Sequence, residues 1–143
     1  MKKFYFSLEK ILSLRIFYER EAEVALQKAV GERDAVRLQI EKIDASLFST
    51  SSLFAQDVDM SNLYQAEQYI KALKARKLQL QAVLITLEGT VRECLQNYHE
   101  ALKERKVLDR LKDKKMEEWK EGCEKEEMFM LDEALSAKIR IGS

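Results

Sequence analysis

The sequence predicts an all-α protein: a two-helix antiparallel coiled-coil hairpin with a longer second helix. The 143-residue chain has no proline, only four glycines and 35% charged residues, a composition typical of long helices. Apolar residues recur at helical spacing along two long runs, and a polar stretch separates the runs. We therefore expect a single coiled-coil hairpin over residues 1–143, with helices at about 8–48 and 61–137 and a connector at about 49–60.

The first run carries an apolar stripe whose spacing is close to a heptad, as in the seam of a coiled coil. The middle of this seam consists of alanines, so a partner helix can approach closely there. The predicted seam residues are Leu8, Ile11, Tyr18, Ala22, Ala25, Ala29, Val36, Ile40, Ile43 and Leu47.

The connector and the second run follow. Residues 49–52 read Ser-Thr-Ser-Ser, which favours hydrogen bonds from side chain to backbone over a continued helix. The second run starts near Leu63 and has a seam in which Lys77 is the only charged member. Its positions are Leu63, Ala66, Ile70, Leu73, Lys77, Leu80, Leu84, Leu87, Val91, Cys94, Tyr98 and Ala101.

Each run has one apolar stripe that it cannot bury alone, so we expect the two to pair as antiparallel neighbours. Small residues of the first run then face leucines of the second, with Val36 beside Leu73 and Ala29 beside Leu80. The alternative is a parallel dimer of single long helices. The connector and the match of small to large side chains favour the hairpin.

The two ends of the chain meet at the open end of such a hairpin. The aromatic triplet at residues 4–6 is expected beside residues 102–111, where it caps the coiled coil against Leu108 and Leu111 or faces a partner. Residues 103–143 overhang in this pairing.

The overhang changes the sign of its charge. Residues 103–115 hold seven Lys or Arg against three Asp or Glu, whereas residues 116–127 hold two against six. Unburied apolar side chains on such a charged helix indicate a docking surface.

The composition argues against several classes of function. The chain has no glycine-rich phosphate loop, one histidine, and two cysteines without metal-site spacing, so we predict no enzyme and no cofactor. A net charge of zero argues against broad attraction to nucleic acid or anionic lipid. No apolar run is long enough to span a bilayer, and we expect a cytoplasmic protein.

The opening F-x-F-x-L-E-K-I-L-x-L-R, from Phe4 to Arg15, resembles the start of the flagellar FliJ family, and the resemblance extends through the whole chain. It implies a cytoplasmic coiled-coil component of the flagellar type III export apparatus, similar to the central stalk of rotary ATPases. The paired terminal ends would insert into the flagellar export ATPase ring and promote its assembly and turnover. The resemblance also implies contact with the export-gate membrane protein, escort of export chaperones, and a position at the inner face of the cell membrane through these partners.

The resemblance implies a gate contact on the second helix, where the stretch EQYIKALKARKLQL matches. Tyr69 and Leu73 carry over, while Arg76 and Leu80 stand where the family has a small and a polar residue. The candidate contacts with the ATPase ring are aromatic and basic side chains near the open end: Phe4, Phe6, Arg105, Lys106 and Arg110.

Three other readings remain open. The chain could be the stalk of a virulence-type secretion system or a cytoplasmic scaffold coiled coil without an ATPase partner. It could also bind nucleic acid through Lys103 to Lys115, although the acidic stretch that follows counts against this.

Overall fold

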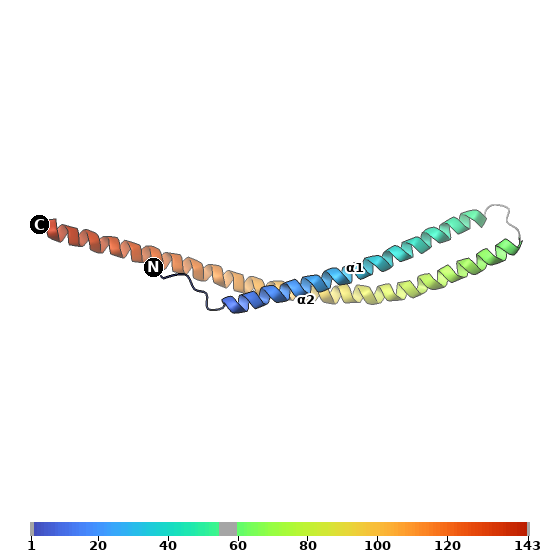
Figure 1. Cartoon of the computed structure of the whole chain (residues 1–143), viewed down its shortest axis with the longest axis horizontal. Helices are drawn as coiled ribbons and strands as arrows, with labels where there is room; N and C mark the ends of the chain where they lie inside the picture. Colours follow the sequence, from blue (N-terminus) through green and yellow to red (C-terminus); the bar gives the residue numbers. More distant parts are fainter. Residues whose placement is uncertain (1, 55–59, 143) are drawn as a thin grey trace. The chain divides into compact units, whose positions relative to one another are not determined.

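The computed structural model describes residues 2–54 and 60–142, and nearly all of them are helical. Helix α1 spans Glu9–Phe54 (46 residues) and helix α2 spans Met60–Gly142 (83 residues) (Figure 1). The two helices pack against each other, and the described residues contain no strand. The prediction of an all-α antiparallel hairpin with a longer second helix is therefore confirmed.

Contacts divide the chain into two compact units. The hairpin unit is Arg20–His99, and the terminal unit combines Met1–Glu19 with Glu100–Ser143. Each unit pairs a part of α1 with a part of α2. The expectation that residues 1–143 form a single hairpin stays a prediction.

The seam of α2 was predicted correctly over most of its length. Every predicted position from Ala66 to Ala101 is buried or half-buried, and Leu80 and Val91 are the most enclosed. Leu63, the first predicted position, is 43% exposed. The charged member of the seam, Lys77, places its ammonium group 2.6 Å from the carboxylate of Asp44 on α1, which supplies a partner for the charge.

The seam of α1 was predicted only in part. Ile11, Tyr18 and Ala25 are exposed, and their neighbours Leu12 and Leu26 are enclosed instead. The prediction failed because the seam includes charged residues. A pattern built from apolar residues alone skips these positions and selects exposed neighbours instead. Most of the enclosed positions follow alternating steps of four and three: Leu8, Leu12, Arg15, Glu19, Ala22, Leu26, Ala29, Arg33, Val36, Ile40, Ile43 and Leu47.

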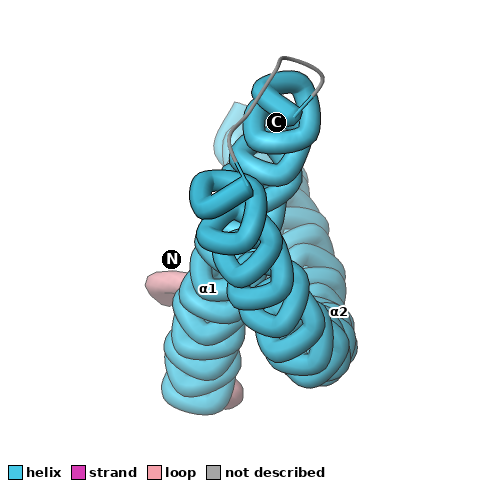
Figure 2. The backbone as a smooth tube through the Cα atoms, turned by 90° about the vertical axis from the view of Figure 1, so that its right-hand side faces the viewer, coloured by secondary structure: helices cyan, strands magenta, loops and turns pink. Residues whose placement is uncertain are grey.

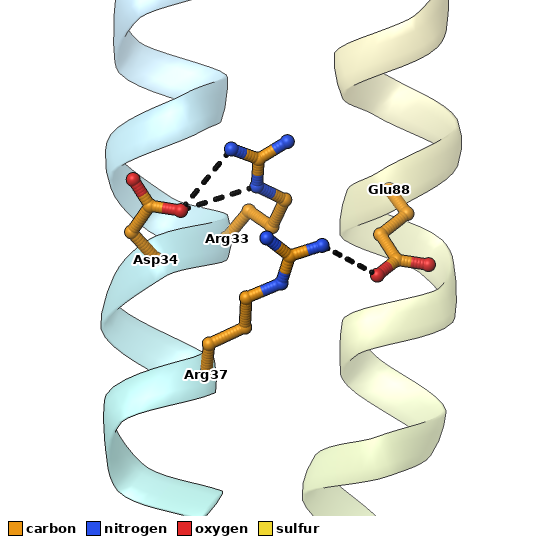
Figure 3. Close-up of polar contacts among 4 residues, drawn as sticks. All are labelled: Arg33, Asp34, Arg37 and Glu88. Carbon is orange, nitrogen blue, oxygen red and sulfur yellow. Dashed lines mark hydrogen bonds and ion pairs between the residues drawn. The ribbon is translucent and has the colours of Figure 1, made fainter. Parts of the chain in front are cut away.

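The predicted register of the two helices was wrong. It would place Asp44 near Gln65, whereas Asp44 pairs with Lys77, about 18 Å further along α2. Arg37 of α1 likewise donates to Glu88 of α2 over 3.1 Å, as Figure 3 shows. A heptad pattern repeats every seven residues, so apolar spacing alone allows several registers. The ion pairs between the helices distinguish one of them.

The predicted connector began too early, because α1 continues through residues 49–52 and ends at Phe54. The Thr50 hydroxyl donates a 2.8 Å hydrogen bond to the Ser46 carbonyl one turn earlier, so the helix itself satisfies this polar group. Helix α2 likewise ends at Gly142 instead of about 137. The rest of the predicted connector, residues 55–59, lies outside the described residues.

We predict that Leu80→Ala lowers the free energy of unfolding by about 2 kcal/mol, because Leu80 is only 5% exposed. The matched control is Leu78→Ala on the same helix, where the side chain is 68% exposed and the change should stay within about 0.5 kcal/mol. Urea titration followed by circular dichroism measures both. Equal losses would contradict the described seam.

Candidate functional site

The chain begins with a short non-helical segment, residues 2–8, which we call the N-terminal strap (Figure 2). The Glu9 amide donates to the Phe6 carbonyl over 3.2 Å, which turns the strap into the first turn of α1. Phe6 is 6% exposed, whereas the adjacent Tyr5 is 82% exposed. The strap thus inserts one ring into the terminal unit and presents another to solvent.

Trp119 of α2 anchors the strap. Its indole N–H donates to the Lys2 carbonyl over 3.1 Å, and its ring lies 5.8 Å from the Phe4 ring in a tilted arrangement. Such aromatic pairs contribute about 0.5–1.5 kcal/mol beyond their buried area. The expected position beside residues 102–111 was therefore wrong for Phe4, which lies further along α2.

The contact at Trp119 also shortens the predicted overhang. Residues 103–119 of α2 pair with α1 or the strap at several points, and enclosed positions continue as far as Cys123. From residue 124 to residue 142 every side chain is exposed. The helical spacing of Lys112, Met116 and Trp119 was the sequence signal for this extension.

Ion pairs join α1 and α2 within the terminal unit. Arg15 lies 2.6 Å from Glu104, and Lys112 lies 2.9 Å from Glu9. Arg105 contacts Glu19 across the helices and Asp109 one turn along α2. All three pairs between the helices place a cation of one helix against a carboxylate of the other, so they fix the register of this unit as well.

Arg105 does not serve as a freely accessible cation. Its side chain is 25% exposed and belongs to the seam. The hydrogen bond to Glu19 raises the pKa of Arg105 above its ordinary value, although burial acts in the opposite direction. The guanidinium therefore stays charged and is engaged within the chain, unlike the exposed candidates Lys106 and Arg110.

Four exposed cations of this region lie along one face of α2. Lys103, Lys106, Arg110 and Lys114 follow one another at steps of three or four and are all exposed. We call these four residues the basic stripe. Val107, which is 63% exposed, lies among them. The basic segment was predicted from the sequence. Which of its side chains are exposed became clear only from the way in which α1 and α2 pair.

Beyond Cys123, α2 carries a set of large apolar side chains that are between 54% and 86% exposed. We call this set the apolar end. Its members are Met128, Phe129, Met130, Leu131, Leu135, Ile139 and Ile141. An exposed group of this size is typical of a surface that binds another protein.

The candidate gate residues lie on α2 in the hairpin unit, but they do not share one accessible face. Leu80 is 5% exposed and Leu73 is half-buried on the seam. Tyr69 is 50% exposed, and Arg76 is exposed and donates a 3.5 Å hydrogen bond to Gln79. Only Tyr69 and Arg76 are thus readily available to a partner, and the inclusion of Leu80 in an accessible patch is not supported.

The described part of the chain holds no candidate metal-binding cluster and no candidate membrane span. Within residues 2–54 and 60–142, no group of three or more His, Cys, Asp and Glu side chains could hold a metal ion. The same residues include no helix with a stretch long and apolar enough to cross a membrane. Three accessible features stand out in the terminal unit: the strap, the basic stripe and the apolar end.

We predict that Phe4→Ala detaches the strap and shifts the fluorescence of Trp119, the single tryptophan, toward that of a hydrated indole. The loss should amount to about 1 kcal/mol of local stability. Tyr5→Ala is the matched control, since Tyr5 is 82% exposed, and its spectrum should equal that of the wild type. Identical spectra for all three proteins would contradict the anchoring of the strap.

Comparison with known proteins identifies the family of this chain. The sequence model of the flagellar FliJ protein matches residues 4–140, from the strap to the apolar end. No curated protein and no solved structure matched the chain. Because the family match covers nearly the whole chain, this protein belongs to the flagellar FliJ family, whose members are non-catalytic components of the flagellar export apparatus.

Proposed function

We propose that this protein acts as a stalk of the flagellar export ATPase, promoting assembly and turnover of the ATPase ring without performing chemistry itself. The terminal unit would enter the ring, and the basic stripe would contact acidic groups on its inner surface. Family membership supports the flagellar system over a virulence-type secretion system. A scaffold role without an ATPase partner has no specific observation in its favour.

The observation that carries this proposal is the basic stripe. Its four cations are exposed on one face of α2, while Arg105 and Lys112 from the same segment are engaged by α1. A protein without catalytic groups can accelerate an enzyme only by binding some of its conformations more tightly than others. If the conformations of the ring differ in the positions of their carboxylates, a row of exposed cations binds some conformations more tightly than others.

The strap provides the second proposed contact with the ring. Phe4 and Phe6 shape the end of the terminal unit, and Tyr5 faces solvent between them. In this arrangement Phe4 and Phe6 act mainly by holding the strap in place. Of the five candidate ring contacts, Lys106 and Arg110 are the ones that we expect to touch the ATPase directly.

We further propose that the hairpin unit contacts the export-gate membrane protein, with Tyr69 and Arg76 as its accessible residues. The protein would also escort export chaperones and stay cytoplasmic, held at the inner face of the membrane by its partners. Neither a nucleic acid nor a cofactor is needed for this role.

We predict that reversing the basic stripe, Lys103→Glu, Lys106→Glu, Arg110→Glu and Lys114→Glu, weakens stimulation of the cognate export ATPase by about ten-fold or more in half-maximal concentration. Four exposed contacts at about 0.3–1 kcal/mol each account for this loss. Arg105 is left unchanged because its reversal would break the pair with Glu19. Steady-state ATP hydrolysis measures the effect, which should shrink as salt is added because the screening length is about 8 Å at physiological salt.

The matched control changes the net charge equally in the hairpin unit, through four exposed lysines at positions 28, 42, 71 and 74, each replaced by Glu. This variant should stimulate the ATPase as the wild type does. Equal loss in both variants would show that only net charge matters, and full stimulation by the stripe variant would remove the stripe from the mechanism.

A separate prediction concerns the gate. Tyr69→Ala should weaken binding to the cytoplasmic part of the export-gate protein, because half of this ring is available to a partner. Tyr64→Ala is the control, since Tyr64 is a tyrosine of the same helix and is 64% exposed. Isothermal titration calorimetry with both variants decides. An equal effect of the two substitutions would contradict a specific role for Tyr69.

A further inference from the structure

The apolar end has one face that is suited to a partner helix. Met130, Ala134, Ala137 and Ile141 recur at steps of four and three, so they form a stripe along one side of α2. An open groove of about 780 Å³ runs beside this stripe, and its lining combines Met130, Ala134 and Ala137 with polar residues such as Asp132, Glu133 and Ser136. Large residues thus stand at the two ends of a stripe whose centre is small, and the whole stripe is exposed in the described chain.

We infer that this face is an antiparallel interface between two copies of this chain, with the two-fold axis near Glu133. In an antiparallel pair centred there, Met130 of one copy lies opposite Ala137 of the other, and the same contact occurs twice. A large side chain then faces a small one, as in the interlocking side chains of paired helices. A surface that complements itself in this way is the property of a two-fold interface.

The charges beside the stripe favour the same partner. Glu126 and Glu127 flank its beginning, and Lys138 and Arg140 flank its end, with one acidic and one basic residue on each side. The antiparallel arrangement places Glu126 opposite Arg140 and Glu127 opposite Lys138, and symmetry repeats both pairs. A parallel arrangement would instead bring like charges together. This pattern selects a second, antiparallel copy over an unspecified apolar partner.

One charge opposes the pairing. Glu133 lies beside the stripe at the centre, so the two-fold axis brings it close to Glu133 of the other copy. Like charges that face each other across an interface destabilise it. The inference therefore predicts a specific position at which removal of a charge strengthens self-association.

The interface is small, so the dimer should be weak. Residues 124–142 form a helix of about 28 Å, and a pair of such helices buries less than the roughly 1,600 Å² of a standard interface. We expect a dissociation constant on the order of 100 µM. The inference does not rest on the proposed ATPase contact, which uses the basic stripe and the strap.

The test is a charge exchange followed by sedimentation equilibrium of the full chain over a range of concentrations. A Glu126→Lys, Glu127→Lys variant and a Lys138→Glu, Arg140→Glu variant should each stay monomeric where the wild type dimerises. An equimolar mixture of the two should form a heterodimer at least as tight as the wild type, since all four pairs then attract.

Two further substitutions test the position of the interface. Met130→Ser should weaken the dimer by about ten-fold. Met128→Ser is the matched control, because it is similarly exposed but lies on another face, and it should have little effect. Glu133→Gln should tighten the dimer. A wild type that stays monomeric at millimolar concentration would overturn the inference, as would equal effects at Met130 and Met128 or no recovery in the mixture.

Discussion

The structure depends on the burial of one narrow seam on each helix. Helices α1 and α2 each carry a single stripe of enclosed residues, and neither can remove its stripe from water without the other. The most enclosed side chains are small or aliphatic residues together with one ring, Phe6. Because a two-helix seam shields only one side of each helix, most of the surface stays available for partners. That division between a thin core and a large exposed surface suits a protein that works by contact.

Charged residues give this seam its register. Lys77, Arg15, Glu19 and Arg105 occupy enclosed positions, and each has a partner of opposite charge on the other helix. Such pairs add little stability, since half-exposed ion pairs contribute about 1 kcal/mol or less. Their effect is to make one alignment of the two helices lower in free energy than the alignments shifted by a heptad, because a shifted alignment would leave these charges without partners. The register in turn decides which cations remain free to form the basic stripe.

The sequence was sufficient for the fold class because composition and helical spacing are local properties. The seam of α2 was also predictable, since its single charged member barely interrupts the apolar pattern. The register and the position of Phe4 were not, because they depend on contacts far apart in the chain, such as Asp44 with Lys77 and Phe4 with Trp119. For the same reason Arg105 was expected to be accessible, although Glu19 engages it. The structure separates the cations that α1 engages from those that are exposed, and only the exposed cations form the basic stripe.

The register can be measured directly with the native residues. A zero-length carbodiimide reagent joins a carboxylate to an amine only where the two groups are in contact, and mass spectrometry identifies the linked peptides. The described register predicts amide links between Asp44 and Lys77 in the hairpin unit and between Glu9 and Lys112 in the terminal unit. A link between Glu32 and Lys77, which the register inferred from apolar spacing alone would favour, would contradict the account.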